Sequence, residues 1–309
     1  MSVCGEVFIM CLYPIQIYVK RKQLPPYDKL IEVGGMFDLP IDYREKVTVS
    51  CGKCLECLRQ KSIEWAFRIM DEASCHSENC FITLTYNNDF LPTDEFGEHS
   101  VSRREVQLFM KRFRKAIAPV KIRFFACGEY GAQYGRPHYH LIIFGWFPSD
   151  AYFWQNDGKT KLYRSPLLEK VWKFGFSSVG KVSYDSALYC AKYMNKAQFD
   201  KRVMKRGDID HIYSYPTRPF VQMSNRPGIG YDCVYRCDLK YDRIYRDGKS
   251  TKIPRYYLKV MERDGIFLEQ FKTLRQAQGE AVARVTDLEV KRKKYRETFN
   301  KKLVKHNRV

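Results

Sequence analysis

Apolar residues recur with a helical period in several segments of the chain. In residues 58–73 they stand at i, i+3, i+4 and i+7, and the same spacing returns in residues 102–118, which is the pattern of a helix with one buried face. Shorter helical patterns cover 166–174 and 186–197. The expected inward residues of the two longer helices are Ile63, Ala66, Phe67, Met70, Val106, Phe109, Met110 and Phe113.

Runs of β-forming residues alternate with these helical segments. They cover 80–87, 121–131, 137–145 and 176–183, and an earlier apolar run at 8–20 is expected to be a buried strand. Strands and helices in this order, with strands that follow one another directly, are typical of an antiparallel sheet. The pattern therefore predicts an α+β fold, in which helices pack against a central antiparallel sheet.

The chain is expected to divide into three parts. Residues 1–57 form an N-terminal extension with a cysteine cluster, residues 58–235 form the core, and residues 236–309 form a basic C-terminal region with a long helix. The end of this helix is polar and rich in Lys and Arg. It is therefore either a solvated helix or an arm that grips DNA.

Charge narrows the classes of function. The chain has 54 Lys and Arg against 35 Asp and Glu, a formal net charge of +19, which creates an attractive field for a polyanion such as nucleic acid. The alternative is a highly soluble basic protein without such a partner. No apolar run is long enough to cross a bilayer, which excludes a membrane-spanning role. The odd number of 11 cysteines favours a reducing cytoplasm over a secreted disulfide framework.

Two histidines separated by one residue begin the apolar run "PHYHLIIFG". Because side chains alternate between the faces of a strand, His138 and His140 share one face. If the preceding strand pairs so that Glu129 stands opposite His138, two imidazoles and a carboxylate converge. Such a set binds magnesium, manganese or zinc and leaves positions open for substrate oxygens. The alternative is that each histidine makes only a structural hydrogen bond, but the shared face favours the metal.

A tyrosine-rich helix is predicted by "SYDSALYCAKYMNKA", with Ser183 or Asp185 as its cap. One face carries small apolar residues, and the opposite face carries phenols and ammonium groups: these are Ala187, Cys190, Ala191 and Met194, and Tyr189, Lys192, Tyr193 and Lys196. A phenol with a pKa of about 10 is a poor nucleophile until cations stabilise its phenolate. Lys192 and a nearby metal ion would do so. The alternative is that the tyrosines only pack and the lysines only solubilise the helix.

The cysteine cluster "CGKCLEC" places Cys51, Cys54 and Cys57 at two-residue gaps, a spacing that gathers thiolates around zinc. A closed structural site needs a fourth ligand, for which the candidates are Cys75, His76 and Cys80. The alternative, which the spacing leaves equally open, is a set of reduced thiols at the start of a helix. A zinc ion here would be structural and separate from the histidine pair.

Together, the histidine pair and the tyrosine helix suit attack on a DNA phosphodiester. A metal ion would polarise the scissile phosphate while a tyrosine forms the covalent bond. Two other classes remain. A non-catalytic nucleic-acid-binding protein would use the basic surface alone, and a zinc-dependent hydrolase built on Glu129, His138 and His140 would use water as its nucleophile.

Three motifs resemble those of the HUH endonucleases that start rolling-circle replication. They are "FITLTY", "GRPHYHLIIFG" and "YCAKYMNK", in that order. The stretches "CLYPIQI", "CGKCLECLRQKSIEWAFRIMDEA", "FACGEYG" and "RPGIG" are similar to the replication initiators of gokushovirus-type microviruses, which are small single-stranded DNA phages. The resemblance runs from about residue 10 to about residue 235. It implies an HUH endonuclease fold with an RRM- or palm-like sheet in residues 58–235.

The resemblance also implies roles for individual residues. His138 and His140 match the paired metal ligands, and Glu129 matches the acidic third ligand, for Mg²⁺ or Mn²⁺. Tyr189 and Tyr193 match the two nucleophiles. Lys192 matches the lysine between them. The motif normally has a bulky hydrophobic residue between its histidines, where this chain has Tyr139.

In the family that the chain resembles, one tyrosine nicks the single-stranded origin and becomes joined to the 5′ phosphate. The free 3′ hydroxyl then serves the host DNA polymerase. The second tyrosine later cleaves the regenerated origin, and the strand is rejoined to a circle. "NDGKTK" and "RDGKSTK" lack the first glycine of a phosphate-binding loop, so a host helicase is expected to unwind the template. The expected location is the cytoplasm of the infected bacterial host.

Overall fold

A computed structural model of the chain describes residues 11, 13–20, 44–93, 99–131, 135–158, 160–196, 219–237, 242–246 and 248–266, with single positions between 268 and 293. The chain forms two compact units, one of residues 1–60 with 267–309 and one of residues 61–266. The start of the predicted strand at 8–20 and nearly all of the predicted C-terminal helix lie outside the described residues.

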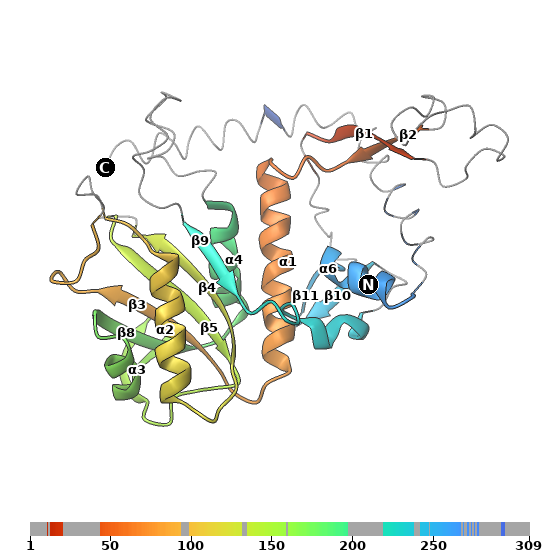
Figure 1. The fold of residues 1–309 in the computed structure, drawn as a ribbon. Helices are drawn as coiled ribbons and strands as arrows, with labels where there is room; N and C mark the ends of the chain where they lie inside the picture. The colour runs from red at the N-terminus through yellow and green to blue at the C-terminus, as the bar shows by residue number, and fades with distance from the viewer. Residues whose placement is uncertain are drawn as a thin grey trace, which may run out of the picture. The chain divides into compact units, whose positions relative to one another are not determined.

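The centre of the unit at 61–266 is an antiparallel sheet of seven strands in the order β6-β7-β8-β3-β5-β4-β9 (Figure 1). The strands are β3 (Asn79–Tyr86), β4 (Arg123–Tyr130), β5 (Pro137–Phe144), β6 (Tyr152–Asp157), β7 (Thr160–Arg164), β8 (Gly175–Lys181) and β9 (Phe220–Met223). The neighbouring strands pair antiparallel throughout. The predicted α+β fold with a central antiparallel sheet is therefore confirmed.

Helices cover both faces of this sheet (Figure 1). They are α1 (Leu55–Ser74), α2 (Arg103–Ala116), α3 (Pro166–Val171) and α4 (Tyr184–Lys196). On one face, α2 and α3 pack against Tyr139, Leu141 and Ile143. On the other face, α1 and α4 pack against Ile142 and Phe144. The alternation of side chains along β5 thus supplies both halves of the core.

Local sequence accounts for the starts of two helices. The Ser102 hydroxyl accepts a hydrogen bond from the Glu105 N–H at 3.3 Å, and the Ser183 hydroxyl accepts one from the Ser186 N–H at 3.2 Å. Both are N-caps that satisfy a backbone donor in the first turn. The predicted inward residues of α2 are all buried. Of the two caps predicted for the tyrosine helix, Ser183 is the one used.

Two hairpins were not predicted. β6 and β7 form the first, and β10 (Arg243–Arg246) and β11 (Lys249–Lys252) form the second. Their turns contain Gly158 and Gly248, whose φ angles are 58° and 71°. An Asp-Gly pair favours such a two-residue turn because glycine adopts positive φ without strain. The glycines of "NDGKTK" and "RDGKSTK" therefore serve strand reversal.

Helix α1 is buried on more than its predicted stripe. Asp71 is fully buried, and its carboxylate accepts hydrogen bonds from the Tyr257 hydroxyl at 2.8 Å and from Arg246 Nε at 2.6 Å. Burial raises the pKa of Asp71, although Arg246 and Tyr257 favour its charged form. Besides the hairpin, the segment around Asp71 includes η3 (Tyr231–Arg236) and α6 (Arg255–Arg263). The polar side of α1 is thus covered by elements from the end of the 61–266 unit.

The unit of residues 1–60 and 267–309 contains a two-stranded sheet of β1 (Ile15–Lys20) and β2 (Arg44–Val49), with Ile15 paired to Val49. The side chains of Ile15 and Ile17 are 47% and 38% exposed. The prediction of a buried strand is therefore wrong for this part of 8–20, because β1 belongs to a two-stranded sheet. No helix within the described residues is long and apolar enough to cross a membrane.

Candidate active site

The pairing of β4 with β5 brings three predicted metal ligands together. Glu129 stands directly opposite His138, as the sequence argument assumed, and the next rung on that face pairs Cys127 with His140. Glu129 Oε1 lies 3.0 Å from His138 Nε2 and 2.8 Å from His140 Nε2. The three potential ligand atoms lie within 4.8 Å of one another.

The other ring nitrogens of the two histidines are held by neighbouring oxygens. His138 Nδ1 lies 3.0 Å from the Arg136 carbonyl oxygen, and His140 Nδ1 lies 3.0 Å from the Thr83 hydroxyl oxygen. A carbonyl only accepts, so His138 Nδ1 carries a proton and donates it. Such contacts orient the imidazoles, and both Nε2 atoms then face Glu129.

The Glu129 carboxylate is a buried negative charge in contact with both rings. Its residue is 1% exposed. Burial raises the pKa of Glu129, but hydrogen bonds with His138, His140 and Tyr189 lower it more and hold it well below its usual range. Two Nε2 atoms that face one carboxylate oxygen need a cation between them, either a proton on each ring or a metal ion. The donor set of one carboxylate and two imidazoles fits a divalent metal ion.

Helix α4 adds two phenols to this group. The Tyr189 hydroxyl donates a hydrogen bond to Glu129 Oε1 at 2.7 Å, and its ring centroid lies 5.0 Å from that of His140. The Tyr193 ring lies nearly parallel to the His140 ring at 6.5 Å and is 5.1 Å from the Tyr189 ring. Burial, followed by the Glu129 carboxylate, raises the pKa of both tyrosines.

The two tyrosines differ in access to solvent. Tyr189 is 39% exposed, whereas Tyr193 is 7% exposed and belongs to the core between α4 and the sheet. The predicted small face of α4 is confirmed for Ala187, Cys190 and Ala191, which are fully buried. The expectation that both phenols lie on a face opposite the buried one is wrong for Tyr193, because α4 turns the tyrosines toward the histidines of β5. The Lys192 side chain is exposed.

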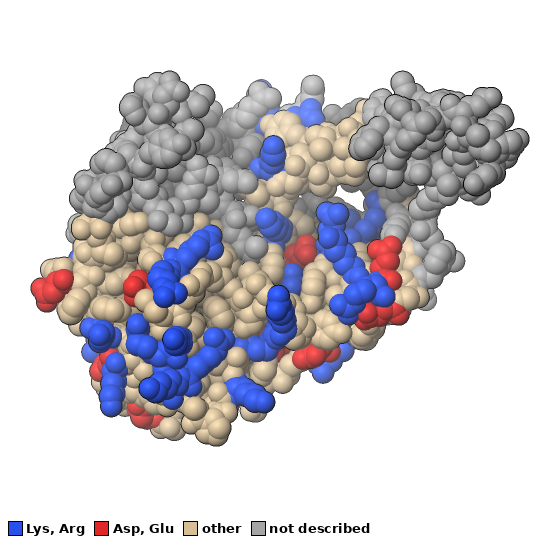
Figure 2. Space-filling view, in the orientation of Figure 1, with Lys and Arg blue, Asp and Glu red and all other residues tan. Residues whose placement is uncertain are grey.

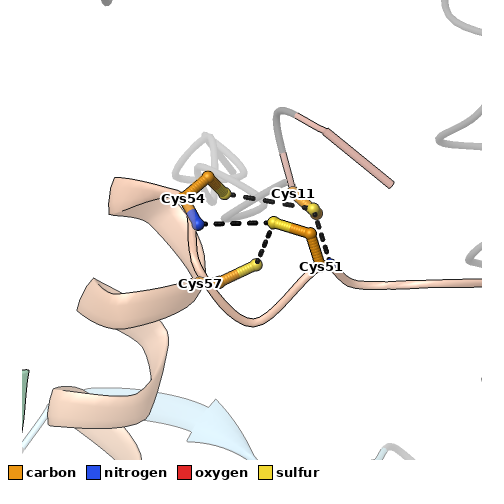
Figure 3. A group of neighbouring side chains, drawn as sticks. All are labelled: Cys11, Cys51, Cys54 and Cys57. Atoms are coloured by element: carbon orange, nitrogen blue, oxygen red, sulfur yellow. Dashed lines mark hydrogen bonds between the residues drawn. The ribbon is translucent and has the colours of Figure 1, made fainter. Parts of the chain in front are cut away.

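A second cluster of potential metal ligands consists of Cys11, Cys51, Cys54 and Cys57, whose sulfur atoms lie within 4.8 Å of one another (Figure 3). The Sγ atoms of Cys11 and Cys54 are 3.9 Å apart, and those of Cys51 and Cys57 are 4.0 Å apart. The Cys51 N–H lies 3.2 Å from Cys11 Sγ, and the Cys54 N–H lies 3.3 Å from Cys51 Sγ.

The fourth member of this cluster is Cys11. The prediction that Cys75, His76 or Cys80 completes it is wrong, because α1 lies between them and Cys57. A helix of 20 residues is about 30 Å long. The Cys75 sulfur instead lies 3.3 Å from that of Cys233. No sequence spacing marked Cys11, which is 40 residues from Cys51.

Lys and Arg are plentiful on the face shown in Figure 2. Helix α2 contributes the exposed residues Arg103, Arg104, Lys111, Arg114 and Lys115. Since α2 packs on the Tyr139 face of the sheet, these cations lie on the side opposite to Glu129 and the histidines. Such a surface suits contacts with phosphate groups rather than recognition of particular bases.

Comparisons with known proteins agree on a family. A family model described as a replication-associated protein of the ORF2 type matches residues 79–198. The chain is 32% identical over 222 residues to the replication-associated protein ORF4 of Chlamydia phage 1, with 69% of this chain and 53% of the relative covered. It thus spans about half the length of that relative.

Two further relatives have similar descriptions. The replication-associated protein ORF2 of Spiroplasma virus 4 is 27% identical over 282 residues, with 86% of this chain and 85% of the relative covered. The replication-associated protein VP4 of Bdellovibrio phage phiMH2K is 28% identical over 219 residues, with coverages of 67% and 65%. No solved structure gives a significant match. The residues 79–198 that the family model matches include Glu129, both histidines and both tyrosines.

Proposed function

Because the chain belongs to the ORF2-type family of replication-associated proteins of small single-stranded DNA phages, we propose that it initiates rolling-circle replication as a metal-dependent DNA nickase and strand transferase. It cleaves single-stranded origin DNA through a covalent 5′-phosphotyrosine intermediate and later rejoins the strand to a circle. The proposal includes an HUH endonuclease fold for the core and a place of action in the cytoplasm of the infected bacterium.

The observation that carries this proposal is the convergence on Glu129 Oε1. The same oxygen lies 2.7 Å from the Tyr189 hydroxyl and within 3.0 Å of both histidine Nε2 atoms. A nucleophile and a cation-binding group therefore face the same small volume. A hydrolase that uses water needs no phenol there, and a protein that only binds nucleic acid needs neither group.

Glu129, His138 and His140 are the proposed ligands of a catalytic Mg²⁺ or Mn²⁺ ion. When bound, such an ion would polarise the scissile phosphate and stabilise negative charge on the departing 3′ oxygen. The chain supports this role by holding the His138 and His140 rings through Arg136 and Thr83, since fixed rings bind metal more tightly than mobile ones.

Tyr189 is the proposed nucleophile of the first cleavage. Its oxygen attacks the phosphorus, a phosphotyrosine bond forms and the bond to the 3′ oxygen breaks. The phenol loses one proton and the new 3′ hydroxyl gains one, so no water is consumed. The exposed fraction of Tyr189 supports this order, because Tyr193 is buried beneath it.

Tyr193 is the proposed nucleophile of the second cleavage, which precedes strand closure. Its ring is in contact with both Tyr189 and His140, so a modest shift of α4 after the first reaction would bring it to the same phosphate site. Lys192, whose side chain is exposed between the two tyrosines, is proposed to stabilise the phenolate charge. The partners are origin DNA, the host DNA polymerase and a host helicase.

The direct test uses the purified chain and single-stranded fragments of its phage genome, each labelled at the 5′ or the 3′ end. With Mn²⁺, we expect cleavage at one site, a 5′ phosphate linked to protein and a free 3′ hydroxyl on a denaturing gel. With EDTA, we expect neither product. Cleavage without a protein adduct would support the hydrolase instead, and binding without cleavage on every fragment would support the DNA-binding alternative.

Substitution of the metal ligands should remove the Mn²⁺ response. We expect His140→Ala and Glu129→Gln to lower the cleavage rate at least about 100-fold, because each removes one of three ligands. A Mn²⁺ titration followed by calorimetry should show a correspondingly weaker site. His99→Ala, which changes a histidine outside the cluster, is the control. Full Mn²⁺-dependent cleavage by His140→Ala would exclude this ligand set.

The four cysteines are the proposed ligands of a structural Zn²⁺ ion. Zinc in a Cys₄ site is tetrahedral, with bonds of about 2.3 Å, and the sulfurs at the vertices are then a little under 4 Å apart. The distances of 3.9 and 4.0 Å fit this arrangement (Figure 3). The N–H groups of Cys51 and Cys54 point at sulfur atoms and would compensate part of the thiolate charge. A disulfide, by contrast, needs an S–S distance of about 2 Å.

A further inference from the structure

The cross-strand register continues the candidate active site over two more strands of the sheet. Glu129 on β4 pairs with His138 on β5, His138 pairs with Thr85 on β3, and Thr85 pairs with Phe176 on β8. Residues directly opposite each other in an antiparallel sheet have their side chains on the same face. Glu129, His138, Thr85 and Phe176 therefore form one row, which is called the active-site row below.

The neighbouring rung confirms which face this is. It runs from Cys127 through His140 and Thr83 to Ser178, and the Thr83 hydroxyl contacts His140 Nδ1 at 3.0 Å. Strands in a sheet lie about 4.8 Å apart. The backbone of Phe176, two strands from His138, is thus about 10 Å from the metal ligands along the active-site row.

Phe176 is 56% exposed, among the most exposed large apolar residues described. It is the only aromatic side chain in the active-site row, and the Thr85 side chain between it and His138 is short. A solvated aromatic ring at this place has an unsatisfied apolar face, beside a site that must receive a nucleic acid strand.

Positive charge accompanies this ring at the same end of the strands. Arg136, just before β5, donates hydrogen bonds to Asn88 Oδ1 at 2.7 Å and to the Tyr86 carbonyl oxygen at 2.8 Å. Both acceptors are neutral, so they leave the guanidinium charge in place. Tyr86 pairs with Gly175, the residue before Phe176, which places Arg136 at the phenylalanine end of the row. An aromatic ring near an arginine is the combination that single-stranded nucleic acids bind, through base stacking and phosphate contact.

We propose that Phe176 is a stacking platform for one base of the single-stranded DNA, next to the scissile phosphate. The inference rests on the proposed nicking function and deepens it. The strand crosses the sheet along the active-site row, with its reacting phosphate at Tyr189 and a neighbouring base on Phe176. Stacking fixes the strand relative to the phenol, so Phe176 is a positioning residue. Because every base has a flat face, the platform adds affinity without strong sequence preference.

Two binding experiments test the platform. The first measures the affinity of Phe176→Ala for a labelled oligothymidylate by fluorescence anisotropy. Loss of one stacked base should weaken binding about 5- to 150-fold, and Phe176→Trp should restore it. Tyr245→Ala is the matched control, since Tyr245 is 57% exposed and lies on β10, outside the large sheet. Its affinity should stay within about 2-fold of the parent.

The second experiment locates the base with a series of oligonucleotides that contain the cleaved site and a single abasic position. In the parent protein, one abasic position close to the scissile phosphate should weaken binding, whereas in Phe176→Ala that position should cost nothing further. Parental affinity and an unchanged abasic profile in Phe176→Ala would overturn the platform even if nicking is normal. Absence of cleavage by the parent protein would instead count against the nicking function, and the oligothymidylate series would still decide whether Phe176 binds bases.

Discussion

Tyr189→Phe is expected to abolish the first cleavage and its protein–DNA adduct, whereas Tyr193→Phe is expected to retain both and to lose strand closure. Phenylalanine keeps the ring and removes only the oxygen that bonds to phosphorus. The cleavage rate of Tyr189→Phe should therefore fall at least about 1000-fold. The asymmetry follows from position, because Tyr189 is exposed and bonded to Glu129, while Tyr193 is buried against His140.

The measurement is a denaturing gel of labelled origin DNA after incubation with Mn²⁺, which separates free 3′ ends, protein-linked 5′ ends and closed circles. Tyr245→Phe, which removes an exposed phenol elsewhere, is the control and should behave as the parent. The double change of Tyr189 and Tyr193 should yield no adduct under any condition. An adduct in the double variant would mean that a different residue is the nucleophile, and equal defects in the two single variants would refute the order.

Zinc removal is expected to have the largest effect on stability. The protein should purify with one Zn²⁺ per chain, and a strong chelator should release it with loss of structure in the unit of residues 1–60 and 267–309. Structural zinc contributes about 10–16 kcal/mol in small metal-dependent folds. A two-stranded sheet such as that of β1 and β2 has little stability of its own in water. Zinc bound by Cys11 and by Cys51, Cys54 and Cys57 would join the start of β1 to the start of α1.

Elemental analysis and thermal unfolding of Cys11→Ser test this expectation. Zinc should be lost from most chains and the unfolding temperature should fall, whereas Cys75→Ser, a change of a half-buried thiol outside the cluster, should keep its zinc. Cleavage of short single-stranded DNA should survive better than stability, since the proposed catalytic groups lie within residues 61–266. A metal-free parent protein that unfolds at the same temperature with and without chelator would exclude the zinc site.

Much of the core and the central chemistry could be predicted from local patterns. The helical period of 102–118 located α2 and its buried residues, since one stripe of α2 faces the sheet. The two-residue alternation along β5 placed His138 and His140 on one face, because a strand has no other way to direct them. A hairpin between neighbouring strands then left few registers for Glu129. Ser183, the cap of α4, could likewise be recognised within one helical turn.

Contacts between distant segments were decided only by the tertiary structure. Cys11 completes the thiol cluster from 40 residues away, and the burial of Asp71 depends on Arg246 and Tyr257, far along the chain. The difference between Tyr189 and Tyr193 arises from how α4 lies on the sheet, which its amphipathic pattern did not specify. Phe176 joined the row of Glu129 and His138 through pairing across three strand interfaces. Sequence periodicity determines which face of its own element a side chain occupies, but burial and pairing across elements depend on the free energy of packing the whole chain.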